Sequence, residues 1–165
     1  MGYRLRFSPA GLVFLLAMFP APGVPDVATT TESASVTAPR IAGVPVGRLE
    51  VVVSGLRNRE GFLHVALYDQ PDGFPGDSRK AFLTHRTAIR AVDTKVVFEG
   101  IPYGEYAVSV LHDEDGDGRR RMRWWVLPRE GTGVSLGGDG RASWSKSLFR
   151  MDRPLLRLPV RMTYP

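Results

Sequence analysis

The chain has 165 residues, a formal net charge of +5 and no cysteine. This length is typical of one domain, and the absence of cysteine excludes disulfides and a lipid-modified N-terminal cysteine. Three of the 22 basic residues and two of the 17 acidic residues precede Arg48, which leaves 19 basic against 15 acidic residues from Arg48 onward. So small an excess is only weak support for a polyanionic partner.

Residues 1–23 have the pattern of a secretory signal peptide. Arg4 and Arg6 are followed by the apolar run AGLVFLLAMF at 10–19 and by the small residues Ala21 to Gly23. The apolar run is shorter than the about 20 residues that cross a bilayer. We expect export to the periplasm or the extracellular space, removal of this segment, and no transmembrane span in the mature chain. The alternative is a retained membrane anchor.

Residues 24–47 are rich in Thr, Ser, Ala and Pro and contain almost no large apolar residue. Such a composition cannot offset the entropy lost on ordering. We therefore expect a flexible linker at 24–47 and a folded domain at 48–165.

Apolar residues of the domain recur with a period of two, which is typical of β-strands. Residues 77–85 indicate a short helical turn at most, and Pro159 places the last strand at a sheet edge or at a bulge. We expect Gly104 to have a positive φ at a turn, and Tyr106 to be buried with a hydrogen-bonded hydroxyl. The pattern predicts one all-β domain, a single antiparallel β-sandwich, with strands at 48–56, 62–69, 94–100, 105–113 and 155–164.

The stretch HDEDGDG, at 112–118, resembles the first half of a calcium loop, D-x-D-x-D-G. Asp113, Asp115 and Asp117 would supply carboxylates, and Arg119 would supply its carbonyl oxygen. The twelfth position, which is a glutamate in a helix-loop-helix calcium site, is Trp124, so the remaining oxygen must come from elsewhere. Glu130 is the nearest later carboxylate. The alternative is a solvated acidic turn that the arginines in RRRMR, at 119–123, neutralise.

The three histidines give little support for catalysis. A strand at 105–113 points His112 and Asp113 to opposite faces, so His112 is expected to hold the loop through a hydrogen bond rather than to bind a metal. His64 and His85 have no local partner in the sequence. No nucleophile-elbow, phosphate-loop or zinc-protease motif is present. We expect a protein that is not an enzyme.

Four stretches of the domain form a recognisable series along the chain: VSGLRNREGFLHVALYD, GFPGDSRKAF, FEGIPYGEYAVSVLHDEDGDG and LPREGTGVS. In this order they resemble an exported family, the domain of unknown function 2141. The resemblance extends from Arg48 to Tyr164. It implies a β-sandwich of the transthyretin-like or carboxypeptidase-regulatory-like type with immunoglobulin-like Greek-key connections, and it implies no activity. The chain departs from the family after the acidic loop, where RRRMR replaces a lysine, an apolar residue and an acidic residue.

These observations leave two hypotheses about function. The first is an exported, non-catalytic module of the cell envelope with a calcium-stabilised loop. Its partner would be an envelope component, for example an acidic polymer or a glycan, and not nucleic acid. The alternative is a metal-dependent envelope hydrolase in which His112 and the aspartates bind the ion.

Overall fold

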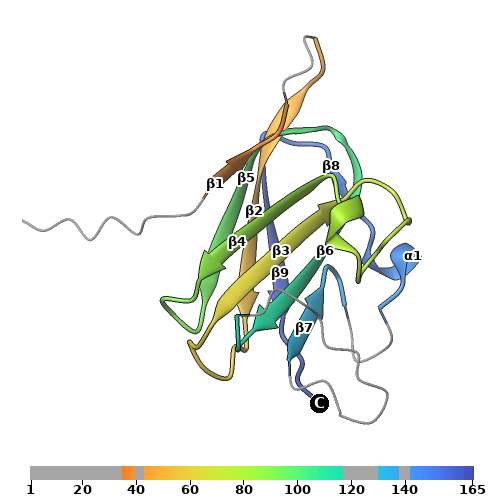
Figure 1. The fold of residues 1–165 in the computed structure, drawn as a ribbon. Coiled ribbons are helices and arrows are strands. Elements are labelled where there is room, and N and C mark those ends of the chain that lie inside the picture. The colour runs from red at the N-terminus through yellow and green to blue at the C-terminus, as the bar shows by residue number, and fades with distance from the viewer. Residues whose placement is uncertain (1–34, 40–42, 117–129, 138–141) are drawn as a thin grey trace, which may run out of the picture. The chain divides into compact units, whose positions relative to one another are not determined.

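A computed structural model describes residues 35–39, 43–116, 130–137 and 142–165 of the chain (Figure 1). All of these residues belong to one unit, 32–165. The expected signal peptide at 1–23 lies outside the described residues. No helix within the described ranges has the length and apolar character needed to cross a membrane.

The first sheet contains four strands in the order β1-β5-β2-β9 (Figure 1). Strands β2 and β5 are antiparallel, whereas β1 runs parallel to β5 and β9 runs parallel to β2. Strand β9 lies at the edge, as Pro159 predicts, because proline has no amide hydrogen for a further neighbour. The strands are β1 (Ser35–Thr37), β2 (Val46–Ser54), β5 (Thr94–Pro102) and β9 (Leu155–Arg161).

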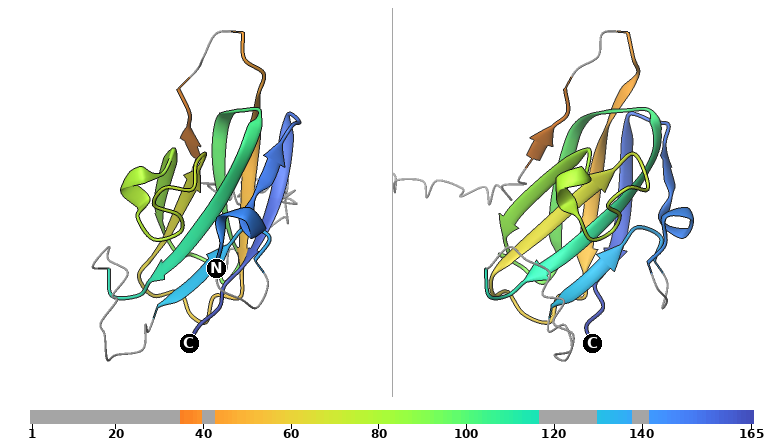
Figure 2. Two further views of the ribbon diagram at one scale, coloured as in Figure 1. Left: turned by 90° about the vertical axis from the view of Figure 1, so that its right-hand side faces the viewer. Right: turned by 45° about the vertical axis from the view of Figure 1, so that its right-hand side comes forward.

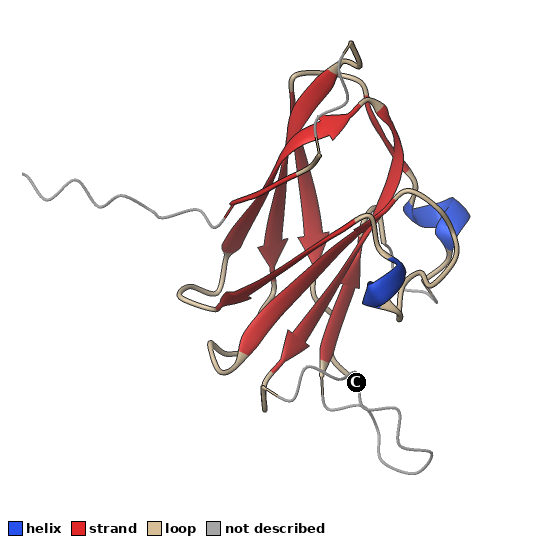
Figure 3. Cartoon of the chain, turned by 45° about the horizontal axis from the view of Figure 1, so that its top comes forward, coloured by secondary structure: helices blue, strands red, loops and turns tan. Residues whose placement is uncertain are grey.

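The second sheet has the order β4-β3-β6-β7, and β8 also pairs with β6. Figure 2 shows β7 beside the C-terminal end of β6. Two short helical elements, η1 (Ser78–Lys80) and α1 (Trp144–Ser147), lie outside the sheets (Figure 3). The strands are β3 (Phe62–Tyr68), β4 (Leu83–Ala88), β6 (Gly104–Asp113), β7 (Gly131–Val134) and β8 (Phe149–Met151).

The core lies between the inner faces of the two sheets (Figure 3). Alternate residues of β2 meet alternate residues of β3 and β6 there, as a period of two requires. Each large aliphatic side chain that leaves water contributes about 1.5–3 kcal/mol. The structure confirms the all-β sandwich, although two of its strand pairs are parallel. The central aliphatic residues are almost fully buried: Leu49, Val51, Val53, Leu63, Val65, Leu67, Val108 and Val110.

The structure corrects the expected linker at 24–47 for part of its length. Strand β1 pairs with β5, Ala38 is buried, and β2 begins at Val46 rather than at Arg48. The backbone of β1 finds hydrogen-bond partners on the edge of β5. The local composition of residues 24–47 does not reveal this pairing. The sequence also missed β4, β7 and β8, each of which lies beside a longer strand that provides its pairing.

The turn between β5 and β6 confirms one expectation and corrects another. Tyr106 is 5% exposed, and its hydroxyl donates a hydrogen bond to the Pro102 carbonyl oxygen at 3.0 Å. Gly104, in contrast, is not among the described glycines with a positive φ. It is the first residue of β6, and an added Cβ there would make an ordinary contact with the Tyr106 ring.

Candidate metal centre

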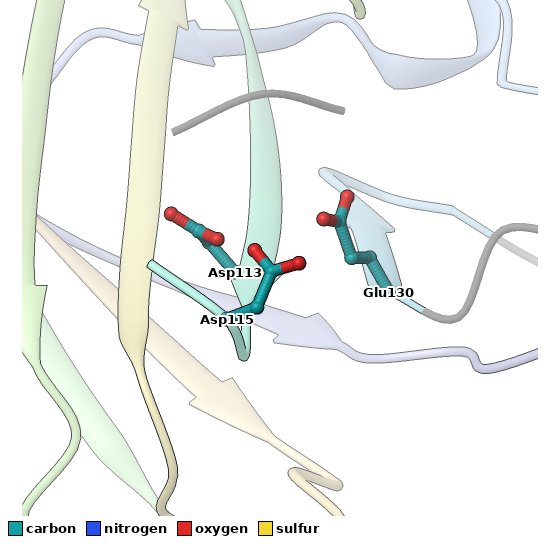
Figure 4. A group of neighbouring side chains, drawn as sticks. All are labelled: Asp113, Asp115 and Glu130. Carbon is teal, nitrogen blue, oxygen red and sulfur yellow. The ribbon is translucent and has the colours of Figure 1, made fainter. Parts of the chain in front are cut away.

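Three carboxylates converge where β6 ends and β7 begins (Figure 4). Asp113 is the last residue of β6, Asp115 follows it in the loop, and Glu130 immediately precedes β7. The antiparallel register pairs His112 with Gly131 and therefore brings Glu130 back beside Asp113. One oxygen atom from each carboxylate lies within 4.8 Å of the other two.

The other two predicted ligands, Asp117 and Arg119, lie outside the described residues, as do Gly118 and Trp124. Of the five predicted metal ligands, the described residues therefore include Asp113, Asp115 and Glu130. Asp113 and Glu130 are buried, whereas Asp115 is exposed. Buried carboxylates at this spacing repel one another strongly in a region of reduced dielectric constant. Oxygen donors of this kind suit a hard divalent cation such as calcium.

Local hydrogen bonds position Asp113 and the start of the loop. Oδ1 of Asp113 accepts a hydrogen bond from the Gly116 amide at 2.9 Å, and Gly116 has a φ of 76°. Its Oδ2 lies 3.0 Å from Nε2 of His64, on the neighbouring strand β3. These two contacts fix the orientation of the Asp113 carboxylate at the end of β6.

His64 has a partner that is distant in the sequence, whereas the sequence analysis considered local partners only. Strand register brings His64 opposite Leu111, two residues from Asp113 and on the same face of the sheet. Nε2 of His64 also lies 3.3 Å from Nε of Arg86. That nitrogen cannot donate to Asp113 and accept from Arg86 at once. Because Asp113 is fully buried and acts only as an acceptor when ionised, we assign the proton on Nε2 to the bond with Asp113.

Glu114 anchors the loop to the β2–β3 connection. Arg57 donates to it through Nε, at 2.6 Å from Oε1, and again through Nη2, and Asn58 Nδ2 lies 3.0 Å from Oε1. The Arg57 hydrogen bond is the main reason that the pKa of Glu114 is lowered, and Asn58 contributes in the same direction. Glu114 thus stays ionised, and it is not one of the three converging carboxylates. Sequence analysis missed this ion pair, whose members are 57 residues apart.

His112 points to the opposite face from Asp113, as strand alternation predicts. It is fully buried, with Nε2 2.8 Å from the Glu60 carbonyl oxygen and Nδ1 2.7 Å from the Tyr164 hydroxyl. The carbonyl can only accept, so Nε2 donates, and Nδ1 accepts from Tyr164. Both ring nitrogens are therefore engaged by groups other than the three converging carboxylates.

Comparisons with known proteins place the chain in a family. Searches of curated proteins and of solved structures each returned no match. A family model matches residues 51–155, which run from the second half of β2 to the start of β9 and include all three carboxylates. The chain belongs to the family described as "Uncharacterized protein conserved in bacteria (DUF2141)".

Proposed function

We propose that this protein is an exported, non-catalytic β-sandwich module of the cell envelope with a calcium ion bound at the loop after β6. The module would bind or support another envelope component. The observation that carries the proposal is the convergence of Asp113, Asp115 and Glu130 from two strand ends, with ligand oxygens within 4.8 Å of one another. The site would tie the start of β7 to the end of β6.

Calcium is favoured over other cations by the chemistry of these residues. Its shell takes six to eight oxygens in a flexible geometry, which carboxylates and loop carbonyls can supply. Magnesium requires a small and nearly ideal octahedron. The His64 contact with Asp113 is the type of outer hydrogen bond that orients a ligating carboxylate.

The hydrolase alternative needs a histidine ligand or base at the ion, and His112 was the residue considered for it. The engagement of both His112 nitrogens with Tyr164 and Glu60 supports the non-catalytic proposal instead. Export is inferred from the sequence pattern of residues 1–23. The transthyretin-like relationship is likewise inferred, from the resemblance of the IPYGEYAVSVLHD stretch.

Thermal melting with calcium and with a chelator tests the ion site. Extracellular calcium modules bind with dissociation constants of about 10⁻⁴–10⁻³ M. Calcium at about ten times that value should stabilise the native state by about 1.4 kcal/mol, which corresponds to a rise in Tm of about 3–6 °C. Magnesium should raise Tm less.

The variants Asp115→Asn and Glu130→Gln should abolish the calcium shift while preserving the fold, because each keeps the shape of the side chain and removes its charge. Asp93→Asn, in the exposed β4–β5 connection, is the matched control and should keep the full shift. Equal Tm values in chelator and in calcium, together with a larger effect of high salt, would show that the loop is a charged turn and would refute the proposal.

A further inference from the structure

A small cavity lies on the outer face of the second sheet, away from the core. It has a volume of about 100 Å³ and is bounded by β3, β6, β7 and the loop at 75–78. Small residues, among them Ala66 and Gly76, leave this space open. The cavity is separate from the three carboxylates, but His64, which lines it, contacts Asp113.

Four polar side chains line the cavity: His64, Ser78, Ser109 and Thr132. Within the described part of the chain, the three hydroxyls and Nδ1 of His64 make no hydrogen bond to the protein. Ser109 is only 9% exposed, so its hydroxyl has little access to bulk water. Polar groups that converge on a cavity without internal partners are suited to bind a polar ligand.

The loop wall of the cavity is held in place by its own contacts. The Phe74 ring packs edge-on against Tyr68 and against Trp144, at 5.4 and 5.7 Å between centroids. The Gly76 and Asp77 amides both donate to the Gly73 carbonyl oxygen. A wall that is already ordered loses little conformational entropy when a ligand binds.

His64 is oriented for one kind of contact. In the tautomer that carries its proton on Nε2, directed at Asp113, the ring has an acceptor at Nδ1. A hydroxyl group of a ligand can donate to that nitrogen, and the hydroxyls of Ser109 and Thr132 can each donate or accept. The three groups lie on adjacent strands of one sheet face.

The charges around the cavity indicate the class of ligand. Among the described lining residues there is no Lys, Arg, Asp or Glu. Beyond the lining, His64 contacts both Asp113 and Arg86, and these two opposite charges select neither an anion nor a cation. We propose that the cavity binds an uncharged, hydroxyl-rich group, namely one ring of a neutral glycan. This inference rests on the proposed function, since it names the ligand class of the envelope module, and it narrows the expected partners by excluding acidic polymers from this site.

The size of the cavity agrees with a single inserted group. Pockets for drug-sized ligands are commonly about 300–1,000 Å³, several times larger than the space here. The rest of a glycan would remain outside, over β6 and β7. Affinity for one isolated ring is therefore expected in the millimolar range, as for small ligands with few contacts.

Titration of the full-length protein with methyl glucoside tests the inference, with glucuronate as the charged counterpart of the same ring. NMR chemical shifts would locate binding, and calorimetry would measure it, in calcium and in chelator. Methyl glucoside should shift the amides around Ser109 and Thr132 more strongly than glucuronate does. Thr132→Val and Ser109→Ala should each weaken binding by about two- to tenfold, the loss of one neutral hydrogen bond.

Thr84→Val is the matched control, because Thr84 is an exposed threonine on the same sheet face that does not line the cavity. Preferential binding of glucuronate would overturn the ligand class. No binding of either sugar, or binding that Thr132→Val and Ser109→Ala leave unchanged, would overturn the inference. The calcium melting shift is measured without sugar, so failure of the glycan site and failure of the calcium site are distinguishable.

Discussion

Nδ1 of His112 lies 2.7 Å from the hydroxyl oxygen of Tyr164, although 52 residues separate them in the chain. His112 belongs to β6 of the second sheet, and Tyr164 follows β9 of the first sheet. The bridge between Thr132 and Thr163 brings the C-terminal segment to β7, and Tyr164 packs over Gly131, where a Cβ would overlap its ring. This hydrogen bond thus links β6 of the second sheet, one residue before Asp113, to the segment that follows β9 of the first sheet.

Replacement of Tyr164 by Phe should lower the free energy of unfolding by about 1–3 kcal/mol, because it leaves the buried His112 acceptor without its donor. Burial is the main reason that the pKa of Tyr164 is raised above 10.0, so the hydroxyl is protonated and can donate at neutral pH. The measurement is denaturant unfolding. Tyr103→Phe, at a partly buried tyrosine packed against the core, is the control and should change stability by less than about 0.5 kcal/mol. Equal losses of stability in the two variants would contradict a stabilising role of the hydrogen bond between Tyr164 and His112.

Gly61→Ala should destabilise the protein by about 2–4 kcal/mol and weaken calcium binding as well. Gly61 has a φ of 68°, and a Cβ there would overlap the Asp113 carbonyl oxygen and the Glu114 backbone. Gly43→Ala separates backbone strain from steric overlap, since Gly43 also has a positive φ, of 82°, but nothing lies within 4 Å of the added Cβ. It should cost only about 1 kcal/mol. Calorimetric melts of both variants, with and without calcium, provide the comparison.

His85 should make stability depend on pH in the mildly acidic range. Burial lowers its pKa below 6.5, and its Nε2 is buried with no hydrogen-bond partner among the described residues. The unfolded chain therefore protonates His85 more readily than the folded chain does. The contribution of His85 to the free energy of unfolding is complete above pH 6.5 and is lost as the pH falls through the lower pKa of the folded state. Tm measured from neutral to mildly acidic pH should fall less for His85→Phe than for the wild type. Parallel curves for the two proteins would disprove this role of His85.

Protein isolated from the native envelope should lack about its first 23 residues, because the n-region arginines and the short apolar run have the pattern of a cleaved signal. Intact-mass spectrometry measures the N-terminus directly. Arg4→Glu combined with Arg6→Glu should slow export and leave precursor inside the cell, since the positive n-region is then lost. A mature protein that retains Met1 would contradict cleavage.

The sequence by itself determined the β class and much of the strand pattern, because side-chain alternation and turn residues are local properties. It also pointed to Glu130 as a neighbour of the aspartates, since this is the next carboxylate along the chain. Only the tertiary structure decided which strands pair and in which register, and that depends on contacts between distant segments. The contacts of His64 with Asp113, Arg57 with Glu114 and Tyr164 with His112 join residues 49, 57 and 52 positions apart. No local pattern encodes them, because each depends on the pairing or packing of segments that are distant in the chain.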